Sequence, residues 1–102
     1  MKVYWTAEAR LRLLDIQAYI AKNSPEAARR TVARLLLRSH ELESEPLVSR
    51  RLPEFPDEPL CEVLERPFRL IFRVTQDRIE IITVKHYRQK LPSNPKHLSG
   101  RR

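Results

Sequence analysis

The chain has 102 residues, of which 41% are hydrophobic, so it is long enough for one domain with one modest core. Its single cysteine, Cys61, excludes an internal disulfide and a cysteine-based metal cage, and its single glycine, Gly100, excludes the glycine-rich loops that bind phosphates. The net charge of +7 is uneven, because residues 1–84 carry 14 Lys or Arg against 13 Asp or Glu, whereas residues 85–102 carry six Lys or Arg and no acid.

This charge distribution bears on partners and location. A local basic patch attracts nucleic acid or an acidic protein partner, although a solvated basic tail has the same composition. The N-terminal stretch MKVYWTAEARLRLL lacks the apolar region of a signal peptide, and no apolar run has the length needed to cross a bilayer. We therefore expect a cytoplasmic protein.

The first elements predicted are a short strand and a helix. Residues 2–5 (KVYW) favour a strand by their β-branched and aromatic content. Thr6 is a suitable N-cap for a helix that ends near residues 22–23. One set of apolar residues recurs at helical spacing: Ala7, Leu11, Leu14, Ala18 and Ala21. Three more widen this apolar stripe: Leu13, Ile16 and Ile20.

A second helix follows directly. Ser24 is a good N-cap, Pro25 fits the first helical position, and Glu26 suits the positive end of the helix. The apolar positions are Ala28, Val32, Leu35, Leu36 and Leu42, and the opposite side carries a row of Arg30, Arg34 and Arg38. Like charges at this spacing repel, so an acidic partner lying across the row would stabilise it; a solvated helix face is the alternative. The short connection predicts an antiparallel helix hairpin.

The second half of the chain predicts strands. Residues 44–59 contain four prolines and indicate a loop. Residues 60–65, 69–74 and 79–84 have strand composition, and their succession predicts a three-stranded antiparallel meander. The fold expected is therefore α+β, with a single domain over residues 1–92 and a basic, flexible tail over residues 93–102.

Several stretches resemble the RelE/ParE superfamily of toxins from type II toxin–antitoxin systems. They are Glu62 on the first strand of the meander, PFRLIFRV (67–74), DRIEIITVKH (77–86), SPEAARRTVARLL at the second helix and RRLPEF before the strands. The resemblance extends to about residue 92 and implies a small toxin that is neutralised by a cognate antitoxin. RelE-like members cut messenger RNA on the ribosome, whereas ParE-like members inhibit DNA gyrase.

The nuclease branch would require catalytic groups at one site. Metal-free RNA cleavage needs a base, an acid and cations that stabilise charge on phosphorus. The side chains available are His86 and Tyr87 at the last strand end, Arg69 on the middle strand, and Glu54 or Glu62 as an alternative base. His86 and Tyr87 are adjacent, so on a strand they point to opposite faces unless the strand ends or bulges there. A structural histidine and an ion pair of Arg69 with Glu62 or Glu65 are the alternatives.

Comparison with the superfamily favours the ParE branch. The positions that match the two catalytic lysines of RelE nucleases hold Leu60 and Glu62, although Arg69 matches their arginine. Phe68 and Phe72 stand where many members have tyrosines. In the YoeB-like branch, a loop glutamate, an arginine and a C-terminal His-Tyr pair are catalytic, and here Glu54, Arg69, His86 and Tyr87 would stand in.

We therefore predict a ParE-like toxin that binds DNA gyrase and uses no cofactor or metal. The target would be contacted by Lys85, Arg88, Lys90 and Arg73. A ParD-like antitoxin with an acidic segment would contact Arg30, Arg34 and Arg38, in a hetero-oligomer. Two alternatives stay open: a ribosome-dependent messenger RNA endonuclease that uses Arg69, His86, Tyr87 and Glu54, and a degenerate member that binds its antitoxin without being toxic.

Overall fold

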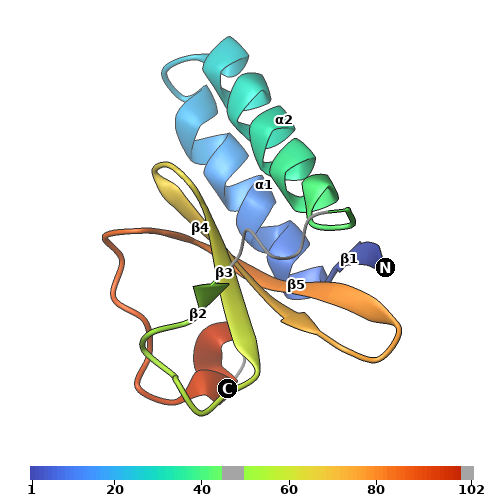
Figure 1. Ribbon diagram of the computed structural model, residues 1–102. Coiled ribbons are helices and arrows are strands. Elements are labelled where there is room, and N and C mark those ends of the chain that lie inside the picture. Colours follow the sequence, from blue (N-terminus) through green and yellow to red (C-terminus); the bar gives the residue numbers. More distant parts are fainter. Residues whose placement is uncertain (45–49, 100–102) are drawn as a thin grey trace.

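Two helices lie side by side on one face of a five-stranded sheet in the computed structural model, which describes residues 1–44 and 50–99 (Figure 1). This arrangement confirms the predicted α+β class. The last three residues of the predicted basic tail, 100–102, and residues 45–49 of the predicted loop lie outside the described residues.

The two helices begin at the predicted caps. Helix α1 spans Ala7–Ala21, and the Thr6 side chain accepts a hydrogen bond from the N–H of Ala9. Helix α2 spans Pro25–Glu41 and is capped by Ser24 in the same way. Each cap satisfies one of the free N–H groups at a helix start. Within the described residues, no helix is both long and apolar enough to cross a membrane.

The sheet contains the predicted meander in its centre and one further strand at each edge. The strands are β1 (Lys2–Trp5), β2 (Arg50–Arg51), β3 (Leu60–Glu65), β4 (Phe68–Val74) and β5 (Arg78–His86), and their order in the sheet is β1-β5-β4-β3-β2. β1 runs parallel to β5, whereas the other neighbours are antiparallel. The two-residue strand β2 lies within the segment predicted to be a loop. Its residue Arg50 pairs with Glu62 of β3 at the edge of the sheet.

A core cluster lies on each face of the sheet. The cluster under the helices contains Ala9, Leu35, Leu42, Val63, Phe68, Leu70, Phe72, Ile79, Ile81 and Val84. The cluster on the opposite face, called the outer face below, contains Leu52, Leu60, Ile71 and Leu98. The sheet is therefore covered on both faces, by the helices on one and by loops and the C-terminal segment on the other.

Helix α1 packs through only one side of the predicted apolar stripe. Leu11 and Leu14 are 51% and 57% exposed, whereas Ala9 is fully buried and Leu13 and Ile16 pack against the core. Both sets recur at helical spacing, so periodicity alone does not distinguish them. A helix can approach a sheet most closely where its side chains are small, and Ala9 provides such a position. On α2, Ala28 and Leu35 are buried as predicted, and so is Leu42 directly after the helix, but Leu36 is 44% exposed.

The pairing of β4 with β5 contains a bulge. Ile71 lies opposite Thr83 while the next residue, Phe72, lies opposite Ile81, so Ile82 has no partner in β4. A bulge shifts the alternation of side chains by one residue. His86 therefore shares the helix face with Val84, whereas Ile82 packs on the outer face.

The C-terminal segment folds back on the sheet. Pro95–Ser99 forms a short 3-10 helix, and its Leu98 is only 1% exposed in the outer-face cluster. This differs from the flexible tail expected from residue 93 onward. The apolar side chain of Leu98 is buried against Leu60 and Ile71, and this burial holds the segment to the sheet.

Candidate functional site

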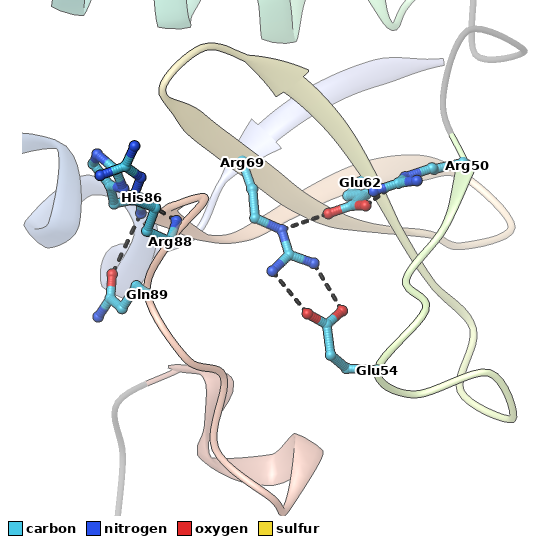
Figure 2. Close-up of polar contacts among 7 residues, drawn as sticks. All are labelled: Arg50, Glu54, Glu62, Arg69, His86, Arg88 and Gln89. Carbon is cyan, nitrogen blue, oxygen red and sulfur yellow. Dashed lines mark hydrogen bonds and ion pairs between the residues drawn. The ribbon is translucent and has the colours of Figure 1, made fainter.

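Four charged side chains form a continuous cluster at the edge of the outer face (Figure 2). Glu62 on β3 accepts hydrogen bonds from the Nε atoms of Arg50 and Arg69, each at 2.6 Å. Arg69 on β4 also donates from Nη1 and Nη2 to the two carboxylate oxygens of Glu54, at 2.9 and 2.8 Å. We call Arg50, Glu54, Glu62 and Arg69 the polar cluster.

Burial of the charged groups in the polar cluster costs free energy, because they lose their contacts with water. The Glu62 side chain is fully buried and that of Arg69 is 7% exposed. A buried ion pair is stable only when its remaining polar atoms are also hydrogen bonded. Arg69 also lies directly opposite Lys85 on β5, so its charge needs compensation on the same face. The two carboxylates provide it. Of the two ion pairs considered as the alternative for Arg69, with Glu62 or Glu65, the structure forms the one with Glu62.

The ion pair between Glu54 and Arg69 shifts the titration of both groups. The hydrogen bond from Arg69 lowers the pKa of Glu54 below its usual range. The same bond raises the pKa of Arg69. Glu54 therefore stays ionised, and its oxygens are occupied. A carboxylate with a lowered pKa is a weak general base, so this environment does not suit the catalytic role considered for Glu54.

A cleft of about 480 Å³ opens beside the polar cluster. Its lining residues are Glu54, Phe55, Arg69, Tyr87, Arg88, Gln89, Lys90, Leu91, Pro92 and Ser93. Three of the four candidate catalytic residues, Glu54, Arg69 and Tyr87, thus meet at one cavity. Phe55 and the segment 91–93 also line it. They were not predicted, because no periodic pattern marks the loops that carry them.

His86 lies at a different cavity. It lines a groove of about 500 Å³ between the helix hairpin and the end of the sheet. The other lining residues are Asp15, Ile16, Tyr19, Ile20, Thr31, Arg34, Pro67 and Phe68. We call this cavity the helix-side groove. The bulge in β5 accounts for the separation, because it turns His86 toward the helices while Arg69 faces the outer side.

Local contacts hold His86 in place. The ring Nδ1 atom of His86 accepts a hydrogen bond from the backbone N–H of Arg88 at 3.1 Å. The backbone N–H of His86 donates to the side-chain oxygen of Gln89 (Figure 2). Its ring stacks on that of Tyr87, with centroids 5.4 Å apart. The strand ends at His86, so Tyr87 can turn toward the cleft while its ring touches His86. These contacts match the structural role considered for this histidine.

The residues predicted to contact the target lie along the outer face. Arg88 and Lys90 line the cleft, and Lys85 pairs with Arg69 in the register of β4 and β5. Arg73 lines a further cavity of about 330 Å³ together with Lys96 of the C-terminal segment. The structure thus gathers these cations on one face, and their contact with a target stays a prediction.

The arginine row of α2 is partly neutralised within the chain. Arg34 and Arg38 lie 3.6 and 3.8 Å from the carboxylate of Glu65 on β3, and Arg38 also pairs with Glu41. These ion pairs are half-exposed, and Arg30 is exposed. Arg34 alone of the three lines the helix-side groove. Contact of the row with an antitoxin stays a prediction, and Arg34 is the member of the row that lies at a cavity.

Comparison with known proteins agrees with this architecture. Residues 3–91 match the model of a family described as the ParE toxin of type II toxin–antitoxin system, parDE. The chain belongs to this family of ParE toxins. A Sinorhizobium fredii (strain NBRC 101917 / NGR234) protein named “Putative toxin Y4kP” is 34% identical over 93 residues, which cover 89% of this chain and 93% of that protein.

Two solved structures share the fold of this ParE-family chain. A structure of the chromosomal ParDE system from P. aeruginosa has a TM-score of 0.71 and 26% identity, and the match covers 84% of this chain and 95% of that one. The toxin–antitoxin complex RelBE2 from Mycobacterium tuberculosis has a TM-score of 0.60 and 24% identity, over 83% and 95% of the two chains. The predicted membership of the RelE/ParE superfamily, closer to ParE, is confirmed.

Proposed function

We propose that this ParE-family toxin inhibits DNA gyrase by binding it and does not cleave RNA. The observation that carries the proposal is the separation of the candidate catalytic groups. Arg69 and Glu54 are paired with each other in the cleft, whereas His86 lies at the helix-side groove. A general base and a phosphate-binding arginine must reach the same phosphodiester, and this arrangement does not present them together.

The basic outer face supports a binding function. Lys85, Arg88 and Lys90 lie near the end of β5, and Arg73 extends the positive surface along β4. A surface of one charge sign speeds association with an acidic or nucleic-acid-bound partner. Gyrase is the target implied by the ParE resemblance, and action on gyrase would place the protein in the cytoplasm.

The helix-side groove supports binding of an antitoxin. Its apolar walls include Ile16, Ile20 and Phe68, and Arg34 lies at its rim. An amphipathic segment that is disordered when free can fold into such a groove, with apolar anchors inside and an acidic residue against the arginine. We propose a ParD-like antitoxin as this partner, consistent with the ParDE structure to which the chain is similar.

A paired assay tests the proposed target. Purified toxin is added to a gyrase supercoiling reaction and, separately, to translating ribosomes with a defined message. We expect supercoiling to be inhibited, the message to stay intact, and an equimolar amount of antitoxin to restore supercoiling. Cleaved message with normal supercoiling would refute the proposal and support the endonuclease. Normal results in both reactions, with the antitoxin still bound, would support a non-toxic member.

The endonuclease remains a second candidate because Glu54, Arg69 and Tyr87 meet at the cleft. The endonuclease alternative also uses His86, which lines the helix-side groove instead of the cleft. The variant His86→Ala therefore separates the two hypotheses. If the toxin acts by binding through the outer face, His86→Ala should leave growth arrest largely intact. Loss of growth arrest in a folded variant that still binds the antitoxin would favour the nuclease.

A further inference from the structure

Helix α1 has apolar side chains on two opposite faces. Ala9 is buried, and Leu13 and Ile16 pack against the core under the helix. On the opposite face, Leu11 and Leu14 are 51% and 57% exposed. A helix that is apolar on all sides is normally covered on all sides, so the solvent face of α1 has the composition of an interface.

The apolar residues on the solvent face of α1 have the spacing of a coiled-coil seam. They follow one another at intervals of four, three, four and three residues. This repeat of about 3.5 residues keeps a stripe on one helix in contact with a second helix along its length. The stripe, called the α1 seam below, consists of Ala7, Leu11, Leu14 and Ala18, which are exposed, and Ala21, which is half-buried. None of the five lines the cleft or the helix-side groove, so the seam is a separate surface.

Charged side chains flank the α1 seam. In the heptad that the seam defines, Leu11 and Ala18 occupy position a, and Leu14 occupies position d. Arg10, which is exposed, is then at position g, and Asp15 is at the e position that follows. In a parallel pair of helices, a residue at g of one helix faces the next e residue of the other. Arg10 of each copy would therefore face Asp15 of the other copy.

The same charges disfavour an antiparallel pair. Residues at e face each other in that orientation, so Glu8 of one copy would approach Asp15 of the other. Both acids already pair with Arg12 of their own chain, at 3.0 and 3.1 Å. The side chain of Asp15 is nevertheless 66% exposed, so it can contact an arginine of a second copy while Arg12 stays beside it. Charge complementarity thus selects the parallel orientation and a second copy of this chain as the partner.

We propose that the α1 seam is the interface of a homodimer in which the two α1 helices run parallel. Leu11 and Leu14 of one copy pack on the same residues of the other, and two pairs of Arg10 with Asp15 flank them. The interface is isologous, as a two-fold dimer requires. Two leucines per copy make a small apolar contact, so we expect a weak dimer with a dissociation constant of about 10 µM.

The first experiment measures the mass of the purified toxin by analytical ultracentrifugation, from about 1 to about 100 µM. Leu14→Glu removes a central leucine and places two carboxylates together in the dimer. Leu37→Glu is the matched control, because Leu37 is 60% exposed on α2. We expect Leu14→Glu to raise the dissociation constant by more than about tenfold, and Leu37→Glu to change it by less than about twofold.

A charge exchange tests the flanking pairs. Arg10→Asp should weaken the dimer by about fivefold, because it places an acid opposite Asp15 of the other copy. The double variant Arg10→Asp with Asp15→Arg restores opposite charges across the interface and should recover most of the loss. Arg29→Asp, at an exposed position of α2, is the control and should leave dimerisation unchanged. A double variant that is weaker than Arg10→Asp alone would contradict the proposed charge pairs.

Disulfide formation tests the orientation. Ala18→Cys is made in a Cys61→Ser background, since Cys61 is a free cysteine. In the parallel dimer two copies of Ala18 lie side by side, so this variant should cross-link with itself under mild oxidation. In an antiparallel dimer Ala18 would lie near Ala7, and only a mixture with the variant Ala7→Cys would cross-link. Ala33→Cys, on the exposed side of α2, is the control for random collisions.

Three results would overturn the proposal. The first is a wild-type protein that stays monomeric over the whole concentration range. The second is an equal effect of Leu14→Glu and Leu37→Glu on dimerisation, or cross-linking of Ala18→Cys only with Ala7→Cys. The third is a monomeric wild type from which Leu14→Glu removes antitoxin binding, because the seam would then be covered by the antitoxin. Neither gyrase nor RNA enters these experiments, so their outcome is separate from that of the proposed function.

Discussion

Glu62 is a carboxylate in the middle of a buried strand, and two arginines from two neighbouring strands neutralise it. Arg50 approaches from β2 and Arg69 from β4, both at 2.6 Å. The residue thereby connects the short edge strand to the centre of the sheet. The cost of removing its charge from water is offset only while both donors are present.

Loss of the Glu62 carboxylate should therefore destabilise the fold strongly. Glu62→Ala leaves the nearly buried Arg69 with one carboxylate partner, and we expect the free energy of unfolding to fall by about 3 kcal/mol. Glu65→Ala is the matched control on the same strand, because its ion pairs are longer and half-exposed; its cost should stay near 0.5 kcal/mol. Urea unfolding measures both. Equal losses in the two variants would contradict the role of Glu62.

Glu54 should contribute to stability only above acid pH. Its pKa in the folded protein is lowered from an ordinary value of 4.5, so folding favours the ionised form. The stabilisation is present above that ordinary value and is lost as the pH falls through the lowered pKa. Glu54→Gln lacks this dependence. Its free energy of unfolding should fall less steeply than that of wild type as the pH is lowered from 5 to 3, about the ordinary carboxyl range. Identical slopes in urea unfolding at several pH values would refute the expectation.

At the scale of elements, local signals located both helices and the buried side of α2, but they did not fix which side of the α1 stripe is buried. Thr6 and Ser24 mark the helix starts by a chemistry that needs no tertiary contact, and both caps were predicted. The packed face of α1 depends on where the sheet lies, and the apolar stripe is too wide for all of it to be buried. The bulge after Ile71 and the Glu54 loop also depend on contacts between distant segments, so the separation of His86 from Arg69 could not be predicted from their spacing.

The two sides of the apolar stripe of α1 should respond differently to the same substitution. Leu14→Gln alters a side chain that is 57% exposed and should change the free energy of unfolding by less than about 0.5 kcal/mol. Leu13→Gln places an amide against the core and should cost about 2 kcal/mol. Thermal unfolding of both variants checks this. A larger loss for Leu14→Gln than for Leu13→Gln would show that the side of the stripe with Leu11 and Leu14 is the packed one.

At the scale of the whole molecule, the outer face depends on a segment that follows the family match. The match ends at residue 91, yet Leu98 is buried with Leu52, Leu60 and Ile71. Residues 91–93 of the same segment line the cleft. The C-terminal segment therefore both completes the second core cluster and shapes the candidate binding surface.

Truncation of the Leu98 side chain should weaken the packing of the C-terminal segment on the sheet. Leu98→Ala removes a side chain that is 1% exposed and should lower the free energy of unfolding by about 2 kcal/mol. Lys96→Ala, an exposed residue of the same short helix, serves as the control and should have little effect. Urea unfolding measures both variants, and equal stabilities would mean that the segment does not contribute to the core.

The parallel pairing of β1 with β5 also has a consequence for protein synthesis. Lys2 of β1 pairs with Arg78 of β5, and β5 in turn pairs with β4. β1 therefore has no neighbouring strand until β5 has left the ribosome. Contacts between such distant segments form late during chain growth. Products of premature termination before β5 cannot assemble either the outer face or the helix-side groove. Both surfaces therefore form only after β5, Arg78–His86, has been synthesised.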